Sequence, residues 1–417
     1  MSSNTREIKD VFYLVALQGI NYAMPLIVFP YLMVTLGAEK FGYIGFATAV
    51  TQYLMLIVDF GFNLSATKRI ALAKGNQAEL NNIFTSTLYA KVGLLVVSFL
   101  VLFAIAQISR FEIYRETLFV MFLTVVGNTF TFVWLFQGLG QIRFVAIFNA
   151  IAKLSILPLT FIFVKNTGDY LTAALLQSLV SIFAMFVSVG YVMKSRWVKL
   201  TPFVSKNIFF ELKESFPLFF SSAATSIYMV SFVVMLGYFS TPEAVGQYSA
   251  VEKLTRAMCL LVIAPIAQAF YPKISQLGVE NKDTAILLVR KILLFTIACT
   301  TIVFFVLFFF SPYIVLFLGK DYQNSLDLFK IMSFIPLFSG VSIITAQLGI
   351  LALGNSADKK NYQRVCFIAG IVALISIFAI IPCFYAKGAA ISLLLTEVII
   401  CVLMLWYGRN FLKLKKI

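Results

Sequence analysis

Four basic residues lie deep inside stretches of this sequence that are otherwise long, apolar and typical of helices: Lys91, Lys153, Lys253 and Arg256. A Lys or Arg at the centre of a membrane helix costs roughly 2.5–3.5 kcal/mol. Four of them together cost on the order of 10 kcal/mol, which is comparable with the net stability of a typical domain. We therefore expect these side chains to face one another, an acidic partner or a water-filled cavity, and not lipid.

The spacing of neighbouring acidic residues suggests how some of these charges are compensated. Glu252 and Arg256 are four residues apart, so they can pair on one face of a helix. With Lys253 beside them, this group keeps a net positive charge. Lys153 has no acidic residue within a helical turn, whereas Lys91 could pair with an acidic residue on another helix or extend its ammonium toward water.

Three further acidic residues lie in or at the ends of apolar stretches. Glu397 is inside the last one, where it could serve as the structural partner of an internal cation. Asp59 ends the second stretch and is expected to meet water or Arg69. Asp327 precedes Lys330 by one turn, which favours either local pairing between these two or extension of the Lys330 ammonium toward the nearby membrane surface.

The composition is that of an integral membrane protein. Hydrophobic residues make up 61% of the 417 residues and charged residues only 12%, against about 25% charged in soluble domains. The net charge of +15 does not indicate nucleic-acid binding, because the basic residues lie mostly in short loops between apolar spans. No histidine is present, the five cysteines fall within apolar spans, and no phosphate-binding loop occurs. We expect no metal, no cofactor and no ATP hydrolysis.

About twelve apolar segments are long enough to cross a bilayer, which requires roughly 20 residues per helix. Their approximate limits are 11–36, 42–60, 83–108, 117–138, 143–164, 170–193, 215–238, 244–271, 286–311, 326–353, 364–384 and 388–408. The longest polar connection, 194–214, divides the chain nearly in half. The sequence thus predicts an all-α membrane protein with two six-helix lobes, residues 1–200 and 201–417.

The two halves resemble weak repeats. In each half, a proline-containing span is followed by a glycine-led segment that opens the next span, Gly42–Phe46 in the first and Gly246–Ala250 in the second. Six spans per repeat give both halves the same orientation, which predicts a pseudo-twofold axis along the membrane normal and a central cleft between the halves.

Several segments, spread over both halves, resemble the O-antigen flippases of the multidrug/oligosaccharidyl-lipid/polysaccharide exporter superfamily. They are Phe29–Leu32 with Leu36–Gly42, Asp59–Lys68, Trp134–Gly138, Tyr248–Leu254 with Arg256-Ala257, and Pro265–Pro272. One departure is Gly140-Gln141, where the family pattern leads us to expect an acidic residue. This departure argues against a carboxylate role at that position.

The resemblance implies a fold similar to multidrug exporters and a multi-pass location in the bacterial inner membrane, among its lipids. It also implies transport of an undecaprenyl-diphosphate-linked glycan to the periplasm, with a polysaccharide polymerase and a chain-length regulator as partners. Alternating access would be driven by a H⁺ or Na⁺ gradient. Lys91, Lys153, Lys253 and Arg256 are then candidate cargo-binding residues, and Glu252, Glu397 and Asp59 candidate coupling or ion-pair residues.

Two alternatives remain open at this point. A multidrug or cation antiporter of the same superfamily would require an acidic cavity for organic cations, whereas the interior charges here are mainly basic. A membrane polysaccharide polymerase or glycosyltransferase normally requires a sizeable outer loop or a carboxylate cluster at the interface. The predicted outer loops are short, and Asp and Glu together number only 18.

The first prediction concerns the orientation of the chain. Basic residues in alternate connections, starting from the N-terminus, outnumber those in the opposite set by more than three to one, which places both termini in the cytoplasm. Reporter fusions after Ile417 and within 194–214 should therefore be active only with a cytoplasmic reporter. Activity of a periplasmic reporter at either position would contradict the orientation and the twelve-span count.

Overall fold

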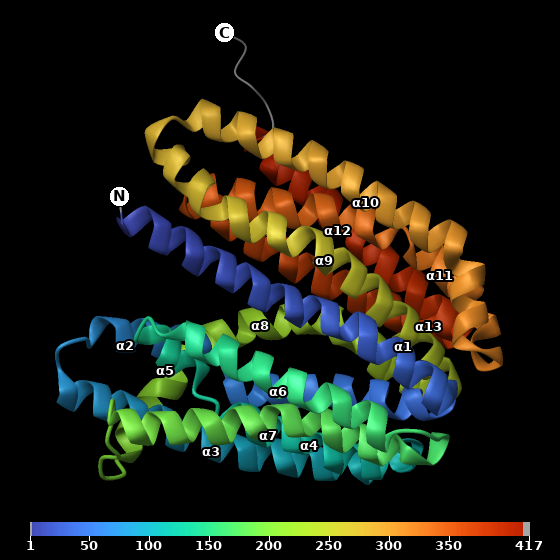
Figure 1. Cartoon of the computed structure of the whole chain (residues 1–417), viewed down its shortest axis with the longest axis horizontal. Coiled ribbons are helices and arrows are strands. Elements are labelled where there is room, and N and C mark those ends of the chain that lie inside the picture. Colours follow the sequence, from blue (N-terminus) through green and yellow to red (C-terminus); the bar gives the residue numbers. More distant parts are fainter. Residues whose placement is uncertain (1, 412–417) are drawn as a thin grey trace. The chain divides into compact units, whose positions relative to one another are not determined.

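The chain folds almost entirely into helices over the part that the structure describes. This structure is a computed structural model, and it describes the backbone of residues 2–411 and the side chains of 24–411, except positions 221, 224, 225, 227, 228 and 410. No strand occurs among these residues (Figure 1). The helices form two compact units, one made of Met1–Leu17 and Tyr43–Ser226, the other of Gln18–Gly42 and Ile227–Ile417.

Unit 1 contains the shorter helices of the first half of the chain. It takes the two ends of α1 (Ser2–Asp59) and the start of α8 (Ser205–Phe239), together with α2 (Phe62–Leu72), α3 (Gln77–Ala106), α4 (Arg115–Thr129), α5 (Val133–Gly138), α6 (Ile142–Phe163) and α7 (Tyr170–Ser195). Inside this unit α4 packs along α7, and α2 packs on α5. Helix α5, which is only six residues long, follows Phe132 in the left-handed backbone region.

Unit 2 contains the longest helices. Besides the middle of α1 and the end of α8, it holds α9 (Pro242–Glu280), α10 (Lys282–Leu318), α11 (Leu326–Met332), α12 (Ile335–Ile344) and α13 (Ser356–Gly408). A π-helical turn, Thr345–Leu351, extends α12. Such turns are rare and often occur at functional sites.

The sequence predicts a boundary between two lobes at residue 200. The structure divides the chain differently, because residues 18–42 group with the second half. The two six-helix lobes stay a prediction.

The helices have the length and apolarity that membrane spans need. Within the described residues eight helices are long and apolar enough to cross a membrane, or nine if a bent pair is counted as one span. Two of the long helices each join two shorter ones across a break, α1 at Gly37 and α13 at Tyr385, where φ is positive. The twelve-span count and the orientation of the termini stay predictions.

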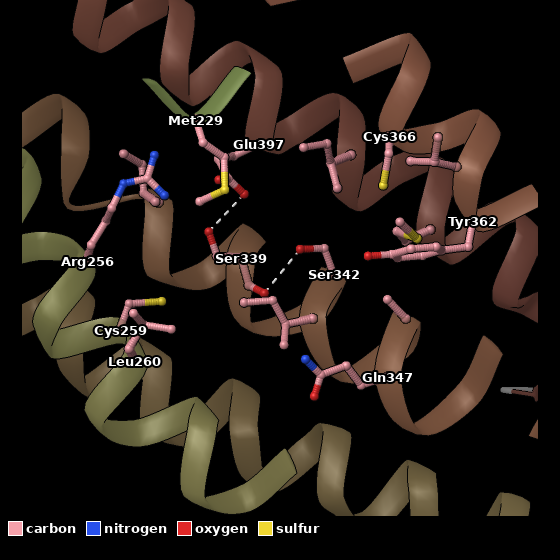
Figure 2. A pocket seen from close by; sticks show the side chains of 16 residues that line it. Met229, Arg256, Cys259, Leu260, Ser339, Ser342, Gln347, Tyr362, Cys366 and Glu397 are labelled. Atoms are coloured by element: carbon pink, nitrogen blue, oxygen red, sulfur yellow. Dashed lines mark hydrogen bonds between the residues drawn. The ribbon is translucent and has the colours of Figure 1, made fainter. Parts of the chain in front are cut away.

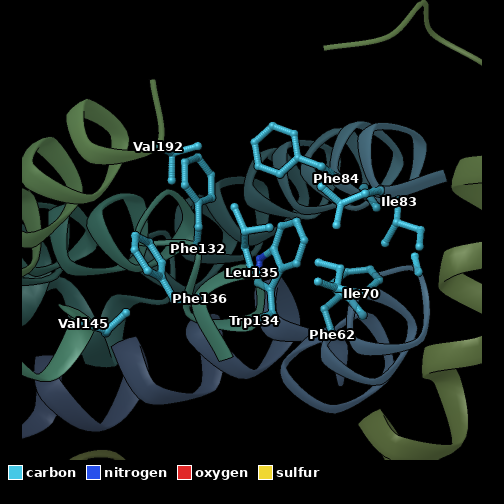
Figure 3. Packing of buried hydrophobic residues seen from close by; sticks show 14 of the residues in the cluster. Phe62, Ile70, Ile83, Phe84, Phe132, Trp134, Leu135, Phe136, Val145 and Val192 are labelled. Atoms are coloured by element: carbon cyan, nitrogen blue, oxygen red, sulfur yellow. The ribbon is translucent and has the colours of Figure 1, made fainter. Parts of the chain in front are cut away.

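The core of unit 1 contains Trp134–Gly138, one of the segments that resemble the flippase family. Trp134, Leu135 and Phe136 of α5 are fully buried and pack against Phe62, Ile70 and Phe84 from α2 and α3 (Figure 3). The Thr67 hydroxyl donates a 3.1 Å hydrogen bond to the Trp134 carbonyl oxygen. The segment Trp134–Gly138 therefore fixes α5 inside the core and contributes packing.

Two glycines let helices approach closely in unit 2. A Cβ at Gly42 would overlap the Pro242 carbonyl oxygen, and a Cβ at Gly246 would overlap the Ala38 carbonyl oxygen. Small residues at such positions bring helix backbones together, as is common in membrane proteins. Gly42 and Gly246, the leading glycines of the two predicted repeat segments, therefore approach each other closely.

This close contact generates a stability prediction. Gly246→Ala should lower the thermal stability of the purified protein, because the new methyl group meets backbone atoms that cannot turn aside, at a cost of about 1–3 kcal/mol. Gly190→Ala in α7 is the matched control, since a Cβ there meets no atom within 4 Å. Equal unfolding temperatures for the two variants in detergent would contradict the close backbone contact.

Candidate functional site

The predicted ion pair on α9 is present in the structure. Arg256 Nε donates a 2.8 Å hydrogen bond to Glu252 Oε1 across one turn of the helix. Glu252 is buried, and Arg256 is partly buried. The Arg256 Nη2 atom is also buried, and no hydrogen-bond partner for it occurs in the described part of the chain. The pair therefore leaves one guanidinium donor available.

Lys253, the next residue along α9 from Glu252, lies over two aromatic rings. Its Nζ is 4.6 Å from the centre of the Phe29 ring and 5.4 Å from that of Phe41. The two rings contact each other edge to face. An ammonium over an aromatic face is attracted by about 0.5–2 kcal/mol. Phe29 and Phe41 are far from Lys253 in sequence, so their spacing does not predict this contact, although both lie in segments that resemble the flippase family.

The buried carboxylate Glu397 joins Arg256 at one cavity within unit 2. This cavity has a volume of about 210 Å³, and its polar lining comes from α9, α12, the π-helical turn and α13 (Figure 2). Ser339 on α12 donates a 2.8 Å hydrogen bond to Glu397 Oε2. Ser342, Gln347 and Tyr362 complete the polar lining. Glu397 thus has a hydroxyl donor and a cation at the same cavity, as expected for a structural partner of an internal charge.

The presence of Glu397 changes the charge of the cluster. We expected a net positive group from Glu252, Lys253 and Arg256, and with these three alone that is correct. The structure adds Glu397 at the same cavity as Arg256, so two cations face two carboxylates and the net charge is zero when all four are ionised. The expectation of a net positive cluster stays a prediction, because the net charge depends on whether Glu397, which only the fold brings to this cavity, holds a proton.

In unit 1, Lys91 is compensated by an acidic residue of another helix. Lys91 Nζ lies 2.8 Å from Asp59 Oδ1, and Lys91 is only 2% exposed. The interpretation in which Lys91 extends toward water is therefore wrong. Asp59 also does not pair with Arg69 as expected, because Arg69 instead binds the carboxylate of Glu211. The cargo-binding role of Lys91 stays a prediction, now with Asp59 as its partner.

Lys153 occupies the middle of α6 and is half-buried. It belongs to unit 1 together with Lys91, whereas Lys253 and Arg256 belong to unit 2. The four candidate cations are therefore divided two and two between the units. The cargo-binding role of Lys153 stays a prediction.

Two ion pairs involve residues that the sequence analysis either missed or paired wrongly. Glu211 is buried near the start of α8 and accepts hydrogen bonds from Arg69 and from the Ser86 hydroxyl. Asp327 binds Lys387 at 2.6 Å and not Lys330, so the expected local pairing is wrong. Lys330 is exposed, and its extension toward the membrane surface stays a prediction. In both cases the partner comes from a distant part of the sequence.

The residues that the structure describes do not form a metal-binding group of three or more Cys, Asp or Glu. The five cysteines form no disulfide. The chemistry available at the cavity is therefore ion pairing, hydrogen bonding and proton exchange by carboxyl and hydroxyl groups.

Comparisons with known proteins identify the family of this chain. A family model described as "Polysaccharide biosynthesis protein" matches residues 8–278. A protein of Escherichia coli (strain K12) named "Putative O-antigen transporter" is 31% identical over 408 residues, which cover 96% of both chains. The chain belongs to the polysaccharide biosynthesis protein family. A Shigella dysenteriae protein of the same name is 32% identical over 95% of this chain and 98% of its own.

Solved structures show the fold of this family member. The lipid II flippase MurJ in an inward closed conformation has a TM-score of 0.75 at 16% identity, covering 95% of this chain and 87% of its own. An inward-facing multidrug resistance MATE transporter of the MOP superfamily has a TM-score of 0.71 at 13% identity, covering 93% and 97%. The expectations of an all-helical fold like that of multidrug exporters and of a place in the flippase family are confirmed. The chain is a multi-pass membrane transporter and not an enzyme.

The charge arrangement of unit 2 generates the third prediction. Arg256→Gln should lower the unfolding temperature in detergent more than Lys253→Gln, because Arg256 pairs with buried Glu252 and lies at the same cavity as Glu397, while Lys253 contacts ring faces. Removing one member of a buried pair costs about 3–5 kcal/mol. The double variant Glu252→Gln with Arg256→Gln should recover part of the loss. A double variant less stable than either single variant would contradict this account.

Proposed function

We propose that this chain is a flippase for a lipid-linked oligosaccharide in the bacterial inner membrane. Its cargo would be an undecaprenyl-diphosphate-linked repeat unit of O-antigen or a related surface polysaccharide, moved from the cytoplasmic to the periplasmic leaflet by alternating access. The observation that carries the proposal is the similarity, over nearly the whole chain, to proteins named as O-antigen transporters. A polymerase and a chain-length regulator would use the product on the periplasmic side.

The buried cations support an anionic cargo. Lys153 and Arg256 lie within helices long enough to span a membrane. A charged side chain inside a membrane costs free energy, so its presence there favours a functional role. Arg256 keeps one buried nitrogen without a hydrogen-bond partner among the described residues. A diphosphate is an anion that suits guanidinium and ammonium donors. An organic-cation exporter would gain nothing from these groups.

Glu397 supports coupling to an ion gradient. Its carboxylate shares the cavity with Arg256 and accepts a hydrogen bond from Ser339. Protonation of Glu397 would change the net charge of the four-residue cluster from zero to plus one. Proton binding would then favour an anion nearby, and proton loss would favour its release. A Na⁺ ion held by carboxylate and hydroxyl oxygens would change the charge in the same sense.

A charge series at Lys153 tests the proposal. The assay is translocation of a fluorescent polyprenyl-diphosphate oligosaccharide in proteoliposomes, with and without a H⁺ or Na⁺ gradient. Lys153→Arg should retain much of the activity, Lys153→Gln should fall between, and Lys153→Glu should abolish it, because the anionic head group responds to the sign of the charge.

The matched control is Lys165→Glu, an equal charge reversal at an exposed position just beyond the end of α6. It should leave translocation close to the wild-type rate. Equal activity of the Gln and Glu variants at Lys153, at normal protein levels, would show that the cargo does not sense positive charge at this position. A wild-type protein that moves no lipid-linked oligosaccharide would overturn the proposed function itself.

A further inference from the structure

A second polar cavity lies in unit 1, away from the residues discussed above. Its volume is about 370 Å³, and it lies where three connections meet: those between α2 and α3, α5 and α6, and α7 and α8. Lys74, Gln77, Gln141, Arg196 and Trp197 form most of its lining. Within the described part of the chain this lining contains two cations and no carboxylate. Glu79, on the first turn of α3, instead accepts a hydrogen bond from the Asn76 side chain.

The walls of this cavity are fixed by hydrogen bonds and ring packing. Gln77 Nε2 donates a 2.9 Å hydrogen bond to the Trp197 carbonyl oxygen. The backbone N–H groups of Lys199 and Thr201 donate to the side chains of Asn81 and Thr85 on α3, at 2.8 and 2.9 Å. The Trp197 ring packs edge to face on Phe136 and Tyr191. The chain that follows Arg196 is therefore tied to α3, and the cavity does not depend on a loosely placed loop.

Backbone dipoles add to the positive potential of the two cations. The 30-residue α3 begins at Gln77 and the 22-residue α6 begins at Ile142, immediately after Gln141. Both helix beginnings therefore lie at the cavity. The Gln141 side chain makes no capping hydrogen bond, so N–H groups of the first turn of α6 stay available. Helix N-termini favour negative charge, and here they reinforce Lys74 and Arg196.

The surroundings of the cavity are apolar and exposed. Leu72 is two residues before Lys74, and Met193 and Leu200 lie on either side of Arg196 and Trp197. Their exposed fractions are 76%, 74% and 64%. All three connections also belong to the basic set that the charge bias places on the cytoplasmic side. A basic pocket with a Trp and an apolar rim at a membrane surface is suited to a lipid head group.

We propose that this cavity binds the phosphate of an anionic phospholipid of the cytoplasmic leaflet. Lys74 and Arg196 would contact the phosphate oxygens, and Trp197 would lie at the level of the head groups. The exposed Leu72, Met193 and Leu200 would contact the acyl chains. None of the candidate cargo-binding residues lines this cavity, so the proposal stands whether or not the chain flips a lipid-linked oligosaccharide.

The test compares lipid binding by the purified full-length protein in detergent. Native mass spectrometry would measure adducts of phosphatidylglycerol and of phosphatidylcholine with the same acyl chains. Phosphatidylglycerol should bind more tightly, and Lys74→Gln with Arg196→Gln should weaken it about 30-fold, since each basic residue near an anionic surface contributes about fivefold. Lys74→Arg with Arg196→Lys keeps both charges and should bind close to wild type.

The matched control is Lys194→Gln with Lys199→Gln. It removes the same amount of charge at two exposed positions on either side of Arg196 that do not line the cavity, and it should bind phosphatidylglycerol nearly as well as the wild type. An equal loss in the control would show diffuse attraction to the surface and overturn the site. Equal binding of the two lipids would also overturn it. Displacement of the lipid by millimolar glycerol phosphate would indicate a soluble phosphate compound instead of a membrane lipid.

Discussion

The cost of placing charge among apolar helices governs this structure. A membrane interior offers almost no water, so each internal Lys or Arg requires an opposite charge, a ring face or a polar cavity. The structure supplies a different solution for three of the four cations: Asp59 for Lys91, two phenylalanine rings for Lys253, and Glu252 with the Glu397 cavity for Arg256. The Glu252–Arg256 pair lies within α9, whereas the contacts of Lys91 and Lys253 each join two different helices, so these two contacts also hold helices together.

The cluster in unit 2 is better understood as a nearly neutral group with an adjustable charge than as a fixed positive patch. With two cations and two carboxylates, its net charge depends on whether Glu397 holds a proton. The cavity beside it is lined by hydroxyl, amide and thiol groups and by apolar side chains. Electrostatic interactions are stronger in such surroundings than in water, so a change of charge there has a large effect on neighbouring groups. In the function proposed above, such a group would allow an anionic cargo to be bound and later released.

Packing of small residues and aromatic rings holds these charges in place. Gly42 and Gly246 bring their helix backbones together close to the part of α9 that carries Glu252, Lys253 and Arg256. In unit 1 the buried Trp134 and Phe136 fix the short α5 between α2 and α3. Trp197 packs on Phe136 in turn, so the core also supports the wall of the basic cavity. Local interactions alone would not set these positions, since α5 is too short to be stable by itself.

The sequence by itself determined the class of the protein, its helices and its local pairs. Apolar segments of span length predicted an all-helical membrane fold, and the four-residue spacing of Glu252 and Arg256 predicted their ion pair, because helix geometry fixes which near neighbours meet. Only the tertiary structure decided the distant partners. Asp59 binds Lys91 and not Arg69, and Glu211 binds Arg69. Asp327 binds Lys387 and not Lys330, and Glu397 lies at the same cavity as Arg256. Which distant residues pair depends on how the helices pack. Apolar helices of similar composition carry little sequence information about which of their faces will meet.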